Sequence, residues 1–90
     1  MQQSKENIAY FNKTVGKLLK DLRGSNLDTS INNFSREFDF DRGNLSKVER
    51  GLLSCRFVTM WKIAEALQIK FSDFAKLLEE KLGDDFTLID

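Results

Sequence analysis

Apolar residues recur at helical spacing in five successive short segments of the chain, and no proline interrupts any of them. The first stripe runs from Ile8 to Leu22, and Gly24 follows it as a residue that commonly ends a helix. Gly16 lies inside this stripe, where glycine weakens a helix by about 1 kcal/mol relative to alanine. A polar loop is expected over residues 25–29. The pattern therefore predicts an all-α fold.

Capping and turn residues divide the rest of the chain into four further helices. Ser30 is a typical N-cap for the second helix, and Asp41 for the third, after a turn that includes Asp39 and Phe40. The residues expected to face the core are Phe34, Phe38, Leu45, Val48, Leu52, Phe57, Met60, Trp61, Ile63, Ala64, Leu67, Phe71, Phe74, Leu77, Leu78 and Leu82. We expect a compact bundle of about five short helices. One domain would span residues 1–83, followed by a short acidic and apolar tail over residues 84–90.

The composition excludes several classes of protein. A single cysteine, Cys55, rules out an internal disulfide, and without histidine there is neither a typical metal site nor a histidine-activated nucleophile. No glycine-rich phosphate loop is present. We therefore expect no enzymatic activity, no metal and no cofactor. The polar N-terminal segment and the absence of a membrane-length apolar run predict a cytoplasmic protein without a membrane partner.

The charged residues are unevenly distributed, although the net charge is zero. Residues 42–62 contain five basic residues and one acidic residue, whereas residues 79–90 contain five acidic residues and one lysine. One interpretation is a pair of ordinary solvated faces. The other is a basic face for DNA with an acidic region elsewhere. Zero net charge argues against a general nucleic-acid coat protein.

Residues 30–51 contain most of the parts that a helix-turn-helix requires. Ser35 supplies a small residue within the first helix, and Asp39 supplies a turn residue that tolerates left-handed geometry. Leu45 and Val48 would anchor the second helix to the core. Its other side would carry side chains that hydrogen-bond bases and phosphates, namely Arg42, Asn44 and Lys47.

Three sequence blocks resemble the Cro/repressor-type, or lambda-repressor-like, helix-turn-helix family. The family's recognition-helix end is similar to N-L-S-K-V-E-R-G at residues 44–51, and its fourth helix to M-W-K-I-A-E-A-L-Q-I at residues 60–69. The end of its first helix is similar to L-L-K-D-L-R at residues 18–23. The resemblance covers about residues 8–78. It implies a sequence-specific regulator of transcription, of the repressor kind, that binds double-stranded DNA at a palindromic operator.

The resemblance also implies a set of site residues. The DNA contacts would come from Ser30, Arg42, Gly43, Asn44, Lys47, Arg50 and Arg56. Arg42 can bind a guanine bidentately, while Lys47 can reach a base or a phosphate. The family pattern further implies a structural ion pair between Glu49 and Arg23.

Some positions depart from the family pattern. Ile31 stands where the family often has a glutamine that touches the DNA backbone, Asp39 replaces a turn glycine, and Cys55 replaces a proline. Gly43 brings no side chain to the expected reading face. The substitution at Ile31 and the neutral net charge favour an alternative function, a helical protein-interaction module without DNA binding.

The apolar residues of the fifth helix and the tail exceed what one helix face can bury. The tail adds Phe86, Leu88 and Ile89 to this surplus. Surplus apolar surface in a small domain predicts a partner, and we expect a homodimer through helix five and the tail. The alternative is that the tail folds back onto its own subunit.

Overall fold

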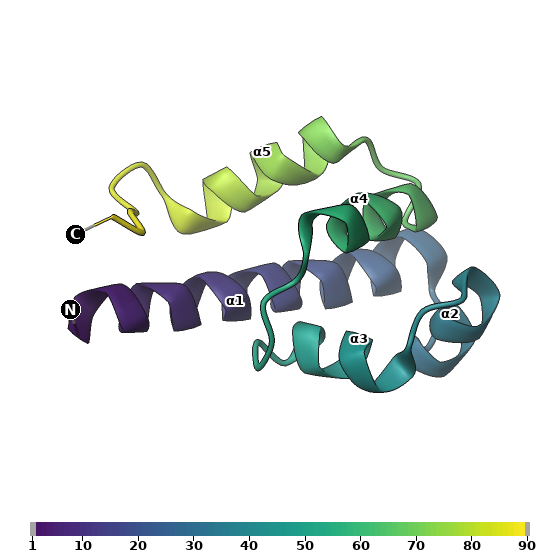
Figure 1. The fold of residues 1–90 in the computed structure, drawn as a ribbon. Helices are drawn as coiled ribbons and strands as arrows, with labels where there is room; N and C mark the ends of the chain where they lie inside the picture. The colour runs from purple at the N-terminus through teal and green to yellow at the C-terminus, as the bar shows by residue number, and fades with distance from the viewer. Residues whose placement is uncertain (1, 90) are drawn as a thin grey trace.

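The chain folds into five α-helices in a computed structural model that describes residues 2–89 (Figure 1). The helices are α1 (Gln2–Leu22), α2 (Ile31–Phe38), α3 (Arg42–Glu49), α4 (Phe57–Ala66) and α5 (Phe71–Leu82). Residues 2–89 contain no strand, so the predicted all-α fold is confirmed. None of the helices in this range combines the length and the apolar character needed to cross a membrane.

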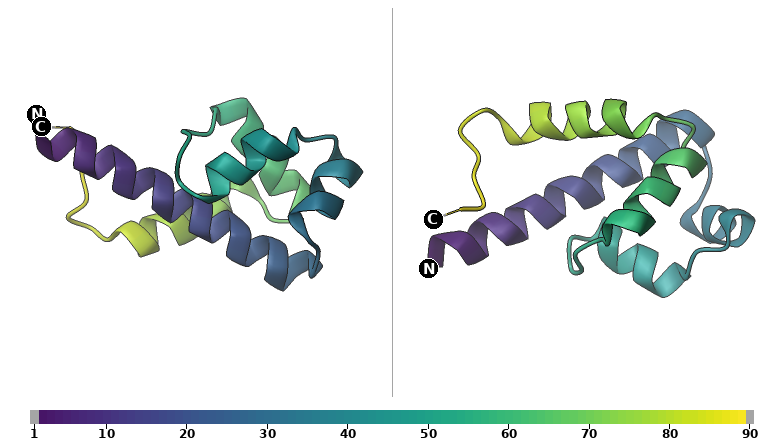
Figure 2. Two further views of the ribbon diagram at one scale, coloured as in Figure 1. Left: turned by 90° about the horizontal axis from the view of Figure 1, so that it is seen from below. Right: turned by 45° about the horizontal axis from the view of Figure 1, so that its top comes forward.

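The long helix α1 runs along the molecule, with α3 and α5 packed along it, while α2 packs against α3 and α4 against α5 (Figures 1 and 2). Its N-terminal part lies beside the C-terminal tail, where the Asn7 side chain donates a 2.8 Å hydrogen bond to the backbone oxygen of Thr87. The ring of Phe86 lies 6.0 Å from those of Tyr10 and Phe11. The tail therefore folds back onto its own chain, which is the alternative that the sequence left open.

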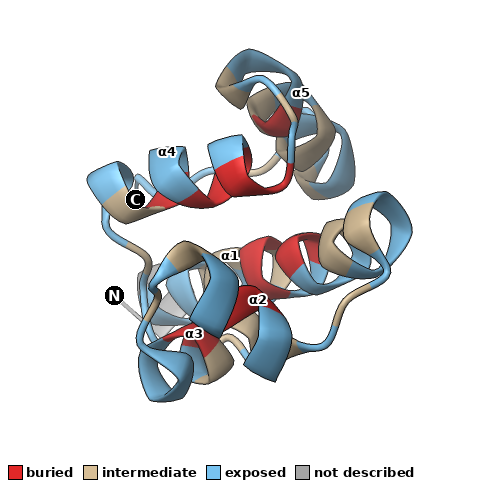
Figure 3. Ribbon diagram, turned by 90° about the vertical axis from the view of Figure 1, so that its right-hand side faces the viewer, coloured by how far each residue is buried: buried red, intermediate tan, exposed pale blue. Residues whose placement is uncertain are grey.

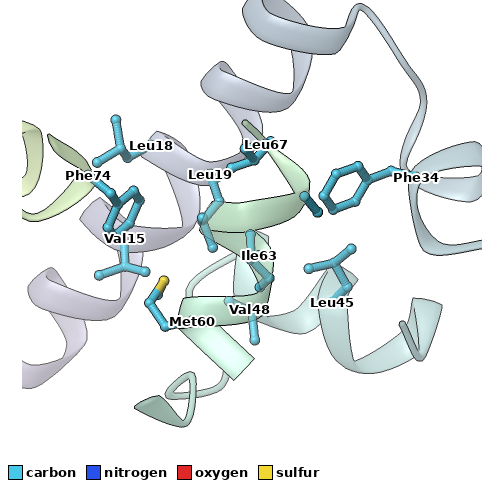
Figure 4. Packing of buried hydrophobic residues seen from close by; sticks show 11 residues of the cluster. Val15, Leu18, Leu19, Phe34, Leu45, Val48, Met60, Ile63, Leu67 and Phe74 are labelled. Atoms are coloured by element: carbon cyan, nitrogen blue, oxygen red, sulfur yellow. The ribbon is translucent and has the colours of Figure 1, made fainter. Parts of the chain in front are cut away.

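A single apolar core joins all five helices (Figure 4). Its most deeply buried large side chains are Phe34, Phe74, Leu19, Ile63 and Leu67, and each is exposed by 1% or less. Leu45 and Val48 bring α3 into the same cluster. Helical spacing predicted all of these core positions. It did not predict that Leu19 would be the most deeply buried residue of the first stripe.

Three residues predicted to face the core are exposed instead. Leu52 is 65% exposed because α3 ends at Glu49, which leaves Leu52 in the following loop. Phe57 and Trp61 are 70% and 49% exposed on the outer side of α4. The helix is apolar on both sides, and its other side, with Met60 and its buried neighbours, faces the core (Figure 3).

The connection after α1 also differs from the predicted polar loop. The chain continues into one turn of π-helix, Arg23–Leu27, and leaves it at Asp28 with a left-handed φ of 47°. Gly24 therefore does not end the helix. The Asn26 side chain donates a 3.0 Å hydrogen bond to the backbone oxygen of Leu67. This turn thereby connects the end of α1 to the end of α4.

Gly16 is the point at which α1 and the end of α3 come closest. A Cβ placed on Gly16 would lie 2.3 Å from the backbone oxygen of Val48 and 2.5 Å from that of Glu49. These are backbone atoms, so no side-chain rotation can relieve the contact. The glycine that weakens α1 locally is thus required for the packing of α3.

We expect Gly16→Ala to lower the free energy of unfolding. The clash with α3 costs about 1–3 kcal/mol or more as overpacking, which outweighs the gain of about 1 kcal/mol in helix propensity. Gly24→Ala is the matched control, because a Cβ there would meet nothing within 4 Å. Chemical unfolding followed by circular dichroism measures both. A Gly16→Ala protein as stable as the parent would contradict the close approach.

Candidate nucleic-acid interface

The α2–α3 unit, residues 30–49, is built from local signals that the sequence contains. The Ser30 hydroxyl accepts a 3.1 Å hydrogen bond from the backbone N–H of Asn33, and so caps α2. Asp39 ends α2 in the left-handed region, with φ 59°. The Asp41 carboxylate then accepts a 2.9 Å hydrogen bond from the N–H of Asn44 and caps α3. The predicted caps and the predicted left-handed turn residue are confirmed.

The turn between α2 and α3 is held by aromatic packing. The ring of Phe40 stacks on that of Phe34 at 5.6 Å, and the ring of Phe38 also contacts Phe34, at 5.2 Å. Ser35 is buried as the small residue within α2, and its hydroxyl has no hydrogen-bond partner among the described residues. With Phe34 in the core, the turn fixes where α3 begins.

One side of α3 is buried and the other is open. The sequence-predicted contact residues on this helix, Arg42, Gly43, Asn44 and Lys47, are all exposed, as is Arg50 at its C-cap. At 100° per residue, positions 43, 47 and 50 follow one line along the exposed side, and positions 42 and 44 flank it. The helix therefore leaves all five residues exposed, with Arg42 and Asn44 on opposite flanks of the line formed by the other three.

A residue that the sequence analysis missed contacts this face. The Nε of Arg42 donates a hydrogen bond to the Oδ1 of Asn32 on α2. Both terminal nitrogens of the Arg42 guanidinium are left for another acceptor. The available sequence signal was an amide in the first turn of α2. Its hydrogen bond with Arg42 depends on the geometry of the α2–α3 turn, and residue spacing alone does not predict that geometry.

A half-open groove separates α3 from α4 and places two further cations near the interface. Asp41 and Asn44 line one wall, and Arg56 and Lys62 line the other. Cys55 lies in the same groove, where burial raises the pKa of its thiol. A thiol with a raised pKa stays protonated near neutral pH and is a poor nucleophile.

The ion pair expected between Arg23 and Glu49 is present, and it connects the end of α1 to the end of α3. Two hydrogen bonds of 2.9 Å join the guanidinium to the two carboxylate oxygens. The side chains are only 11% and 7% exposed. A third guanidinium nitrogen donates to the backbone oxygen of Thr29 at 2.7 Å. The hydrogen bond with Glu49 raises the pKa of Arg23 above its ordinary value.

Comparisons with protein-family models, with curated proteins and with solved structures found no match to this chain. Within the described part of the chain, no group of three or more histidine, cysteine or acidic side chains is placed to hold a metal ion. The candidate site is the exposed face of α3 with its neighbouring cations.

We expect Glu49→Ala to destabilise the fold by roughly 3 kcal/mol, because it leaves the guanidinium of Arg23 largely buried without its counter-charge. Asp21→Ala is a matched control that breaks the exposed pair between Lys17 and Asp21, which are 78% and 52% exposed. That loss should be below about 1 kcal/mol. Urea unfolding of both variants measures the difference. Equal losses would show that the Arg23–Glu49 pair stabilises no more than a surface contact.

Proposed function

We propose that this chain is a sequence-specific regulator of transcription that binds double-stranded DNA, of the repressor kind. In this proposal α2 and α3 form a helix-turn-helix of the Cro/repressor type, and the exposed side of α3 reads the major groove. The observation that carries the proposal is this side of α3. It gathers two cations and an amide, Arg42, Lys47 and Asn44, on a helix whose opposite side is fixed in the core.

The proposed contacts with bases follow from the chemistry of the side chains. Arg42 has two terminal nitrogens available for a guanine, which accepts through its O6 and N7 atoms. Asn44 can form the corresponding pair of hydrogen bonds with an adenine. Gly43 lies between them, and a Cβ there would meet only the Asp41 carboxylate, at 3.3 Å. The DNA can therefore approach the backbone of α3 closely at this position.

The proposed contacts with phosphates surround the reading face. Ser30 at the N-terminus of α2 uses its oxygen in the cap but keeps its hydroxyl proton as a donor. Arg50 and Arg56 are exposed cations at the end of α3 and the start of α4. Such contacts fix the orientation of a protein on DNA without reading its sequence. A homodimer on a palindromic operator would place two reading helices about 34–36 Å apart.

Titration with random duplex DNA at low salt tests the proposal. Binding that weakens as the salt concentration rises would support it, because phosphate contacts release counterions. Selection from random duplexes followed by sequencing would then give the operator. An absence of association at low salt would overturn the proposal.

The second candidate is a helical protein-interaction module that does not bind DNA. The exposed carboxylates of Asp39 and Asp41 favour it, because they stand in the turn that leads into α3 and would repel phosphates near Arg42. The exposed apolar side of α4 favours it as well. This candidate moves ahead if the low-salt titration shows no binding.

We expect two patterns of loss among alanine variants. Arg42→Ala should cost about 1–3 kcal/mol of binding and relax the preference at one base pair, and Lys47→Ala should do the same if Lys47 reads a base. Arg50→Ala and Arg56→Ala should weaken binding uniformly across sequences, with a shallower salt dependence.

Competition binding with the selected duplex and its single-base variants separates these patterns. Lys76→Ala, which removes an exposed cation of α5, is the control for net charge. It should change neither the preference at a base pair nor the salt dependence of binding. If Arg42→Ala and Lys47→Ala both keep the affinity and selectivity of the parent, α3 is not the reading helix.

Asn32→Ala should relax the same base-pair preference as Arg42→Ala, but less strongly, because the guanidinium remains and loses only the group that orients it. In the Arg42→Ala background the Asn32 substitution should have no further effect on selectivity. A double-mutant cycle on the selected duplex measures this coupling. Additive effects would show that Asn32 contacts DNA independently of Arg42.

A further inference from the structure

The half-open groove that lies between α4 and residues 38–48 has an apolar floor that the proposed DNA contacts do not use. Its volume is about 920 Å³. The floor includes Leu45, Val48 and Ile63 of the core. Leu53 of the loop between α3 and α4 lines the groove as well, and it is 41% exposed. A concave site with an apolar lining and a few polar groups is the usual form of a binding site.

The charged side chains that line this α3–α4 groove carry both signs. They are three carboxylates and two cations, Asp39, Asp41, Glu65, Arg56 and Lys62. All five are exposed, and within residues 2–89 no ion pair joins one of these carboxylates to either cation. An occupant with a strong charge of one sign would meet repulsion in part of the groove. The lining therefore fits an occupant that also carries both signs.

The charges are separated along the groove. α3 and α4 run in opposite directions (Figures 1 and 2), so the end of α3 and the start of α4 share one end of the groove. Arg56 lies at this end, as the N-cap residue of α4. Asp39 and Asp41 precede α3, and Glu65 lies in the last turn of α4, so the carboxylates lie toward the other end. Lys62 lies between the two ends.

The length of the groove matches that of a short extended peptide. From Arg56 to Glu65 the axis of α4 rises by about 13 Å. Five residues of extended chain cover nearly the same distance, at roughly 3.3 Å per residue. Alternate side chains of such a chain point to one side, where the apolar floor lies. Asn44 and Thr59 also line the groove, and their side chains can form hydrogen bonds with a peptide backbone.

We propose that the α3–α4 groove binds an extended segment of a protein partner, about five residues long. The segment has a basic residue at one end, an acidic residue at the other and apolar residues at its second and fourth positions. The basic residue pairs with the carboxylates at the start of α3, and the acidic residue pairs with Arg56. The apolar side chains cover the floor and Leu53.

The groove would also regulate DNA binding, and this step rests on the proposed function. Arg56 and Asn44 are proposed contacts with DNA, and both line the groove. A bound segment would occupy them, so the segment and the duplex should compete. The binding of the segment itself does not depend on DNA.

Titration of the isotope-labelled full chain with the pentapeptide Lys-Leu-Ser-Leu-Glu, capped at both termini, tests the site by two-dimensional NMR. The largest shifts should fall on the backbone amides of Asn44, Leu53 and Thr59, while those of α5 stay in place. The peptides Lys-Ser-Ser-Ser-Glu and Glu-Leu-Ser-Leu-Glu should bind at least about five-fold more weakly. An absence of shifts at the highest soluble concentration of the first peptide overturns the proposal.

A matched pair of substitutions in one loop tests the apolar contact. Leu53→Ser should weaken binding of Lys-Leu-Ser-Leu-Glu by roughly five-fold, because it removes apolar surface that the peptide covers. Leu52→Ser is the control, since Leu52 is 65% exposed and does not line the groove. Neither leucine belongs to the core, so circular dichroism should show an unchanged fold. A loss with Leu52→Ser that equals the loss with Leu53→Ser places the peptide elsewhere and overturns the proposal.

The double variant Asp39→Asn, Asp41→Asn tests the acidic end while keeping the local geometry. Asparagine tolerates the left-handed conformation of residue 39 and caps a helix as well as aspartate does at residue 41. Binding of Lys-Leu-Ser-Leu-Glu should weaken by roughly three-fold or more, and binding of Glu-Leu-Ser-Leu-Glu should not. An equal change for both peptides overturns the pairing of the basic residue with these carboxylates.

Competition with random duplex DNA at low salt separates this proposal from the proposed function. Lys-Leu-Ser-Leu-Glu has no net charge, so it should release the duplex through the groove and not through ionic strength. A chain that binds the peptide but no duplex would sink DNA binding and leave the groove in place. A chain that binds the duplex but not the peptide would sink the groove and leave DNA binding in place. Peptide and duplex bound together at undiminished affinity would overturn the regulation of DNA binding by the groove.

Discussion

The contact between the end of α3 and the middle of α1 is the constraint on which the rest of the structure depends. α3 has eight residues, and only Leu45 and Val48 of them are buried. Two apolar side chains provide little to fix the direction of a helix. Gly16 allows the backbone of α3 to lie directly against α1, and the Arg23–Glu49 pair then holds the same end of α3 from the side.

This arrangement separates the residues that stabilise α3 from the residues that we propose contact DNA. The residues that fix α3 are on its inner side and at its C-terminal end, whereas Arg42, Asn44 and Lys47 take no part in the core. The N-terminal end of α3 is positioned instead by the turn, through the stacking of Phe40 on Phe34. Substitutions on the exposed face can therefore change binding while the fold stays intact, which allows DNA contacts to be tested without unfolding the protein.

The local signals in the sequence predicted the local structure well. Ser30, Asp39 and Asp41 behave as expected because capping and left-handed geometry depend on a few neighbouring residues. The errors fall where an outcome depends on packing between helices. Phe57 and Trp61 belong to a helix with two apolar sides, and the pattern could not say which side meets the core.

Two other features could not be predicted from residue spacing for the same reason. The hydrogen bond between Arg42 and Asn32 requires the angle between α2 and α3, which the turn sets. The role of Gly16 requires the position of α3 against α1, so from the sequence it could be described only as a weak point of the helix. The Arg23–Glu49 pair was expected from a family pattern, and no spacing rule would place two residues 26 positions apart in contact.

The zero net charge and the small reading face together make a dimer physically useful to a DNA reader of this kind. A good bidentate base contact discriminates by about 1–3 kcal/mol, and α3 offers Arg42, Asn44 and at most Lys47 for such contacts. A regulator needs about 4–10 kcal/mol of preference for its site over other DNA. Two such contacts from one copy of α3 reach only the lower part of that range, and two copies on a palindrome double the number of base contacts. In the proposed function, the absence of a large positive charge would keep binding to unrelated sequences weak, so that base contacts rather than phosphate attraction would set the preference.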